Sequence, residues 1–264
     1  MQLTRAQQES LYTHGLVRFP EIVPKEVVNT ALRAVNSSLG TAGIDPEQLV
    51  TFRSQSYCPE LQRSQEITDL LTASPLWELA ESAVGAGAVA PVRSGQIALR
   101  FPSTEPPHDP HPHIDGMYSP HNGVPEGTIQ NFTALIGVFL SDVPAAYSGN
   151  FTVWPGTHRA YETYFREHGP QSLLDGMPAV ELPEPEQVTA KAGDAVLCHY
   201  QIGHGIAGNA SPNTRYAVFF RLSHVDHDSQ RWECMTDIWR EWAGMRDVVT
   251  RAATGGEGGK GAWA

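Results

Sequence analysis

The chain has 264 residues and a formal net charge of −11, with 41% hydrophobic and 18% charged residues. Such an acidic balance argues against a nucleic-acid partner, because nucleic-acid binding depends on lysine and arginine side chains that neutralise phosphates. No run of about 18 apolar residues and no apolar signal region is present, and the three cysteines lack C-x-x-C spacing, so we expect a cytoplasmic protein with reduced thiols and no membrane contact.

Helical patterns dominate the first third of the sequence. Residues 3–14 predict a helix, and residues 15–20 predict a short strand. In the range 24–40, apolar residues recur at three- and four-residue spacing, and Gly40 is a suitable stop. Residues 74–85 predict a second amphipathic helix, with Ser74 as its N-cap ahead of Pro75.

Short strand patterns dominate from Pro91 onward. Strands are predicted at 95–102, 131–143, 150–156 and 214–224, and two more at 188–200 around a turn at 192–194. The polar insertion at 157–187 begins with a helical pattern. The sequence does not decide whether this insertion forms a lid. Residues 231–245 predict a C-terminal helix, and the glycine-rich tail from about 252 to 264 is expected to be disordered.

The order of these elements predicts the fold class. Helices followed by many short antiparallel strands are typical of an α+β protein with a jelly roll at its centre. We therefore expect a cupin-like double-stranded β-helix core with N-terminal helices and a C-terminal helix. No linker composition interrupts the chain, so a single domain over 1–264 is expected.

The stretch PHPHIDGMYSP, at 110–120, contains a candidate metal site. His113 and Asp115 are two residues apart, so a strand end would place both side chains on one face. Two histidines and one carboxylate form the ligand set of non-haem Fe(II) oxygenases. His111 and His113 have the same spacing but lack the carboxylate. The third ligand must come from a distant strand, where 199–209 offers His199 and His204.

His204 is the stronger candidate of the two because it is flanked by glycines in a turn. Arg215 follows eleven residues later, at the start of an alternating strand. A guanidinium there can bind the far carboxylate of 2-oxoglutarate in a bidentate pair. A second His-x-Asp, His224 and Asp226, has no third histidine beyond it on a later strand and is interpreted as a solvated strand end.

Five segments in order, QIALRFP, HPHIDGMYSP, GNFTVWPGTHR, AGDAVLCHYQIGHG and NTRYAVFFR, resemble the phytanoyl-CoA dioxygenase family of Fe(II)/2-oxoglutarate oxygenases. The N-terminal LVRFPEIVPKEVVNTALRAV is also similar, so the resemblance covers most of the chain up to about residue 225. It implies that His113, Asp115 and His204 are the iron ligands and catalytic centre, and that Arg215 anchors 2-oxoglutarate.

The resemblance also implies further co-substrate contacts, from Gln96, Asn131 and Thr133. Some family members carry a hydroxyl residue two positions after the distal histidine, where this chain has Ile206. Thr133 is the expected replacement donor. The cofactors implied are Fe(II), 2-oxoglutarate as co-substrate and O₂, with ascorbate as a supporting reductant. Because the carboxylate ligand is present, halogenation is disfavoured.

The substrate is expected to be a small free metabolite or natural-product intermediate, since no basic patch for the phosphates of CoA is evident. Two arginines among the candidate contacts favour a substrate with a carboxylate or similar anion. The expected substrate contacts are Met117, Tyr118, Trp154, Arg100 and Arg221.

The function expected is hydroxylation with release of succinate and CO₂. The same cofactor chemistry also permits desaturation, cyclisation or epimerisation, and the residues do not choose among these outcomes. Two rival classes are a cupin-like metalloenzyme that does not use 2-oxoglutarate and a non-catalytic binding protein on the same fold. The expected partner is a small molecule, and the expected state is a monomer or homodimer.

Overall fold

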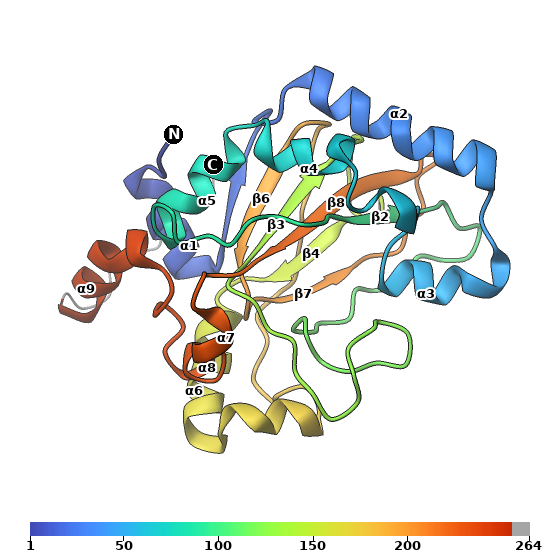
Figure 1. Cartoon of the computed structure of the whole chain (residues 1–264). Coiled ribbons are helices and arrows are strands. Elements are labelled where there is room, and N and C mark those ends of the chain that lie inside the picture. Colours follow the sequence, from blue (N-terminus) through green and yellow to red (C-terminus); the bar gives the residue numbers. More distant parts are fainter. Residues whose placement is uncertain (255–264) are drawn as a thin grey trace.

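Two antiparallel sheets form the centre of the computed structural model, which describes residues 1–254 (Figure 1). One sheet has five strands in the order β1-β6-β3-β8-β2, and the other has three in the order β5-β4-β7. The strands are β1 (Leu16–Phe19), β2 (Gln96–Arg100), β3 (Ala134–Phe139), β4 (Phe151–Trp154), β5 (Glu186–Gln187), β6 (Ala195–His199), β7 (Gly203–Ile206) and β8 (Arg215–Leu222).

Helices from the first third of the chain cover the outer face of the larger sheet (Figure 1). The α-helices are α1 (Arg5–His14), α2 (Lys25–Ala42), α3 (Leu49–Ser54), α4 (Gln65–Thr72), α5 (Leu76–Val84), α6 (Thr157–His168), α7 (His227–Gln230), α8 (Glu233–Thr236) and α9 (Arg246–Thr254). Short 3₁₀ helices lie at Pro46–Gln48, Pro59–Leu61, Pro170–Asp175 and Ala243–Met245.

Alternation along β8 divides the core into two layers. Val218 and Phe220 pack in the cluster between the large sheet and the helices, whereas Ala217 and Phe219 pack in the cluster between the sheets. Successive side chains of a strand point to opposite faces, so one strand supplies both layers. Arg215 shares the face of Ala217 and Phe219, and its side chain therefore lies between the two sheets.

The predicted α+β class with a jelly-roll core is confirmed, but three local expectations differ from the structure. The single helix predicted at 231–245 is wrong, because only Glu233–Thr236 is α-helical there. The chain then turns so that Trp239 and Trp242 pack against His199, whose ring stacks on Trp242 with centroids 5.3 Å apart. Burial of these aromatic rings outweighs the local helical pattern.

The other two differences concern one strand and the C-terminal tail. Of the two strands predicted at 188–200, only the second forms, and the first is reduced to an isolated bridge between Val143 and Ala190. Residues 252–254 complete α9, and the rest of the predicted disordered tail lies outside the described residues. Within residues 1–254, no helix is both long and apolar enough to cross a membrane.

Candidate metal centre

Backbone pairing brings the two distant histidines together. The amide of His113 donates to the carbonyl of His204 over 2.9 Å, and the amide of His204 donates to the carbonyl of His113 over 3.0 Å. Gly205 permits this approach, because a Cβ there would lie 2.4 Å from the carbonyl oxygen of His111. Gly205 thus lets the 111–113 segment pair with β7.

A turn immediately after Asp115 fixes the third side chain. Gly116 has a φ of +91°, a conformation that other residues rarely adopt, and a Cβ there would lie 2.4 Å from the carbonyl oxygen of Gln130. The amide of Gln130 donates to the carbonyl of Gly116 over 2.9 Å. The glycine of the HIDG sequence is therefore required for the path of the chain around Asp115.

Three potential ligand atoms converge at this point. Asp115 Oδ1 lies 3.5 Å from His113 Nε2 and 3.6 Å from His204 Nε2. All three atoms lie within 4.8 Å of one another, close enough to hold one metal ion. The Nδ1–H of His204 donates to the carbonyl of Ile202 over 3.0 Å, which leaves the lone pair on Nε2 available as a ligand.

Arg221 contacts the other oxygen of the same carboxylate. Its Nε and Nη2 lie 2.9 Å and 2.8 Å from Asp115 Oδ2, and its Nη1 donates to Gln96 Oε1 over 2.9 Å. Burial disfavours the charged carboxylate, but Arg221 and the two histidines, His113 and His204, outweigh it and hold the pKa of Asp115 well below its usual range. Asp115 is therefore an anion with Oδ1 directed to the histidines.

We expect Arg221→Met to weaken divalent-metal binding by about 10–100-fold, because partners that orient a metal ligand typically contribute that much. Without Arg221, Asp115 loses the two contacts to Oδ2 that keep Oδ1 directed to the histidines. The dissociation constant for Ni²⁺, measured by chelator competition, checks this. Arg231→Met, at an arginine that pairs with Asp228 instead, is the control. Equal metal affinities in the two variants would contradict the assigned role of Arg221.

A cavity of about 450 Å³ opens beside these residues. As expected, its wall includes Gln96, Arg100, Met117, Tyr118 and Arg221. Arg221 nevertheless differs from the expected substrate cation, because its guanidinium is already paired with Asp115. The wall also includes Arg53 of α3, Phe151 of β4 and Met177, which the sequence patterns did not single out.

Arg215 is buried next to this wall. Its Nε donates to the carbonyl of Gly149 over 2.8 Å, and its Nη1 donates to the carbonyl of Ala98, a wall residue, over 2.9 Å. Its Nη2 is buried without a hydrogen-bond partner. Burial and the neighbouring charge of Arg100 lower the pKa of Arg215 to about 9, so the side chain is still a cation at neutral pH.

Three expected contacts do not line the cavity. Trp154 is buried in β4, away from the cavity wall. Asn131 donates to the carbonyl of Arg231 over 2.6 Å, and Thr133 donates to Glu241 Oε2 over 2.5 Å. These side chains therefore hydrogen-bond outside the cavity. Ile206 lines the cavity but has no hydroxyl group, and Thr133 does not supply one in its place.

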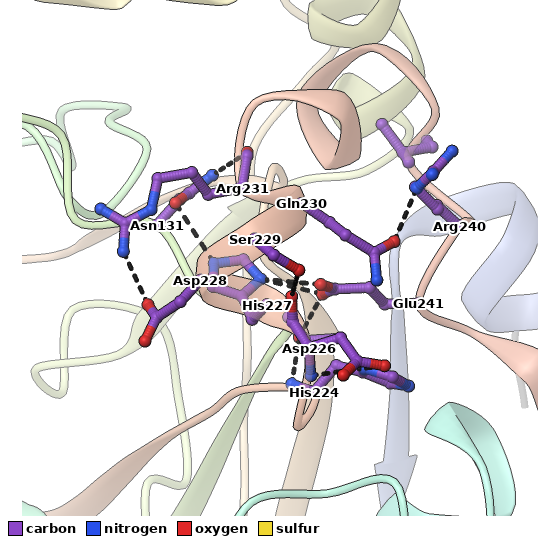
Figure 2. Close-up of polar contacts among 12 residues, drawn as sticks. Asn131, His224, Asp226, His227, Asp228, Ser229, Gln230, Arg231, Arg240 and Glu241 are labelled. Atoms are coloured by element: carbon purple, nitrogen blue, oxygen red, sulfur yellow. Dashed lines mark hydrogen bonds and ion pairs between the residues drawn. The ribbon is translucent and has the colours of Figure 1, made fainter.

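Asn131 belongs instead to a polar cluster with His227 and Glu241, which joins the segment before β3 to the C-terminal segment (Figure 2). Thr133 enters the same cluster through its hydrogen bond to Glu241. The Nδ1 of His227 lies 3.0 Å and 2.9 Å from the two oxygens of Glu241, and its Nε2 lies 3.2 Å from Asn131 Oδ1. Both ring nitrogens of His227 thus face hydrogen-bond acceptors. The Cys234 Sγ lies within 4.8 Å of a carboxylate oxygen of Glu241.

His227, Cys234 and Glu241 also form a second group that could hold a metal. Because His227 Nδ1 is directed to the Glu241 carboxylate, we interpret this group as a structural hydrogen-bonded cluster. Burial opposes the charge on Glu241, but hydrogen bonds from His227 and Thr133 prevail and lower its pKa from the usual 4.5.

Glu241→Gln is expected to cost about 1–3 kcal/mol of unfolding free energy at pH 7, because it disrupts the hydrogen bonds that His227 and Thr133 donate to this buried carboxylate. Since the pKa of Glu241 is lower in the folded protein, its stabilising effect is complete above the unfolded value of 4.5 and is lost as pH falls through the folded value. Urea unfolding at several pH values measures this. Glu233→Gln, at an exposed carboxylate, should change stability little, and a matching loss there would refute the assignment.

The remaining histidines are not part of the metal centre. His108, His111 and His121 are exposed residues of the 101–131 segment. His199 is buried, and its Nε2 donates to the carbonyl of Ile238 over 2.9 Å, so its side chain has a structural contact outside the group of potential ligands.

Comparison with solved structures supports the fold, while no family model and no curated protein sequence matches the chain. The non-heme alpha-ketoglutarate-dependent carbocyclase SnoK from nogalamycin biosynthesis has a TM-score of 0.55 at 20% identity, over 87% of this chain and 91% of its own. HygX from Streptomyces hygroscopicus, with nickel and 2-oxoglutarate bound, has a TM-score of 0.53 at 18% identity, over 84% and 88%.

A third solved structure is similar over comparable lengths. EctD from S. alaskensis, with 2-oxoglutarate and 5-hydroxyectoine, has a TM-score of 0.57 at 15% identity, over 85% of this chain and 77% of its own. At these identities the likeness establishes a shared fold, and the chemistry must be argued from the residues themselves.

Proposed function

We propose that this protein is a non-haem Fe(II)- and 2-oxoglutarate-dependent oxygenase, similar to the phytanoyl-CoA dioxygenase family. The observation that carries the proposal is the convergence of His113, Asp115 and His204 beside a buried arginine with an unpartnered Nη2. Two histidines and one carboxylate leave open positions for a co-substrate and O₂ on the same ion. Arg215 matches the carboxylate of a dicarboxylic keto acid in charge, and its Nη2, which has no partner within residues 1–254, can donate to a carboxylate oxygen.

Each residue has a distinct role in this proposal. His113, Asp115 and His204 would hold Fe(II) through Nε2, Oδ1 and Nε2, and Arg215 would bind the far carboxylate of 2-oxoglutarate. The iron and the keto acid together supply the oxidation of a substrate C–H bond by O₂, with release of succinate and CO₂. Arg221 keeps Asp115 ionised and oriented, while apolar wall residues such as Phe151 and Met177 limit water near the ion.

Hydroxylation of a small metabolite or natural-product intermediate is the outcome we favour. EctD was solved with a hydroxylated small molecule, which supports this choice. SnoK is named a carbocyclase, and the similar SnoN is named an epimerase, so cyclisation and epimerisation are the second candidate outcomes on this fold. The cavity of about 450 Å³ suits a small substrate, since ligand pockets commonly span about 300–1,000 Å³.

Anaerobic titration tests the proposed cofactor pair. Protein with Fe(II) should develop a weak visible charge-transfer band when 2-oxoglutarate is added, and His113→Ala should abolish it. Metal binding without this band would favour a cupin-like metalloenzyme that uses no keto acid. Absence of metal binding would favour a non-catalytic binding protein.

A further inference from the structure

Three arginines lie in or next to the wall of the cavity. Arg215 is buried between the sheets, and Arg100 is its cross-strand partner on β2. Arg53, at the end of α3, is exposed at the wall of the same cavity. No carboxylate of residues 1–254 forms an ion pair with any of the three.

The three charges act on one another. Arg100 lowers the pKa of Arg215, and Arg53 contributes to lowering the pKa of Arg100 after the larger effect of burial. Like charges at this proximity destabilise the protein unless anions bind between them. Asp115 is the one carboxylate in the cavity wall, and it is already paired with Arg221. The cavity is therefore cationic in a chain whose net charge is −11.

Two hydrogen bonds fix the position of α3 beside the cavity. Gln96 donates to the carbonyl of Ser54 over 3.4 Å, which joins β2 to the end of α3. Gln55 donates to the carbonyl of His121 over 2.9 Å, which joins α3 to the 101–131 segment. These contacts hold the end of α3, which carries Arg53, next to β2, which carries Arg100.

The co-substrate 2-oxoglutarate would pair with only one of the three arginines. In the proposed function, Arg215 binds the far carboxylate of 2-oxoglutarate, and its single unpartnered Nη2 suits one such group. Within residues 1–254, the Arg100 guanidinium makes one hydrogen bond, to the carbonyl of Leu99 over 3.0 Å, and leaves most of its donors free. Two cations therefore remain for a second anion.

We propose that Arg53 and Arg100 form an anion subsite that binds a carboxylate or phosphate group of the substrate. The inference rests on the proposed function, because that function assigns Arg215 to the keto acid. The substrate is then a small molecule with an anionic end at the mouth of the cavity and an apolar part against Met117, Phe151 and Met177. Salt should weaken its binding, since Arg53 is exposed to solvent.

Three probes of matched length test the subsite: hexanoate, hexyl phosphate and the neutral hexanamide. Each is titrated by calorimetry into protein that holds Fe(II) and 2-oxoglutarate without O₂. Hexanoate or hexyl phosphate should bind at least about tenfold more tightly than hexanamide, in keeping with charge-assisted hydrogen bonds. The preferred anion tells a carboxylate substrate from a phosphate substrate.

Two variants and one control locate the subsite. Arg53→Gln and Arg100→Gln should each reduce the preference for the anion by about tenfold, as loss of one charged contact predicts. Arg100→Lys should retain part of it. Arg63→Gln, at an exposed arginine outside the cavity wall, should not change it. The thermal midpoint of each variant verifies folding.

Three results would overturn the subsite: equal affinity for hexanoate, hexyl phosphate and hexanamide, an unchanged anion preference in both glutamine variants, or competition between hexanoate and 2-oxoglutarate. The last result would place the anion at Arg215. Failure of the proposed function gives a different signature, because the charge-transfer band would then be absent. An anion preference lost in the Arg53 and Arg100 variants would still support the subsite in that case.

Discussion

His204→Ala is expected to weaken Fe(II) binding by more than about 100-fold, since even residues that only orient a metal ligand contribute 10–100-fold. Succinate release should fall to the level of reactions without iron. The reason is that His204 Nε2 faces the ligand oxygen of Asp115, and within residues 1–254 no histidine besides His113 and His204 belongs to this group. Chelator-competition binding and succinate assays measure the two effects.

A neighbouring histidine provides the matched control for that experiment. His111 lies two residues before His113, is exposed, and is outside the group of potential ligands. We expect His111→Ala to retain metal binding and succinate release. If His204→Ala retained both as well, or if His111→Ala lost both, the ligand assignment would be wrong.

Arg215→Met should raise the dissociation constant for 2-oxoglutarate by roughly 30-fold to several thousandfold, which corresponds to the 2–5 kcal/mol lost when one partner of a buried ion pair is removed. Metal affinity should change little, because Arg215 contacts the carbonyls of Gly149 and Ala98 rather than the ligands. The measurement is a 2-oxoglutarate titration of the Fe(II) protein followed by its charge-transfer band.

Folding must be controlled in this experiment, since methionine leaves those two carbonyls without a donor. Arg215→Lys keeps the charge but loses the planar fork, so its affinity should lie between those of the methionine variant and the native protein. Native 2-oxoglutarate affinity in a folded Arg215→Met protein would show that the keto acid binds elsewhere.

Sequence patterns predicted most of the architecture because its strands alternate clearly and its early helices are amphipathic. β8 was recognised from TRYAVFFRLSH, and α2 from its spacing of apolar residues. The region 231–245 could not be predicted in this way. Its apolar residues have a helical spacing, but Trp239 and Trp242 are held by His199, a partner on a strand far away in sequence.

The candidate metal centre could be located from the sequence because two of its residues follow a short-range pattern. His113 and Asp115 have His-x-Asp spacing, and His204 is flanked by glycines, of which Gly205 permits the close approach of the 111–113 backbone. Asn131 and Thr133 were expected to contact the co-substrate because the resemblance implied it and a strand was predicted over 131–143. β3 begins only at Ala134, and the two side chains hydrogen-bond to Arg231 and Glu241 instead. Arg53 was missed because it lies on a short helix with no motif of its own, and only the fold brings it to the cavity.

Conversion of 2-oxoglutarate to succinate by the purified protein tests the central claim most directly. In the presence of Fe(II), O₂ and ascorbate, we expect succinate to form even without the substrate, at a slow rate, and to stop when iron or O₂ is omitted. His113→Ala and Arg215→Met should both abolish it under limiting 2-oxoglutarate. No succinate above the level of the iron-free reaction, from protein that binds Fe(II), would contradict the assignment as a 2-oxoglutarate oxygenase.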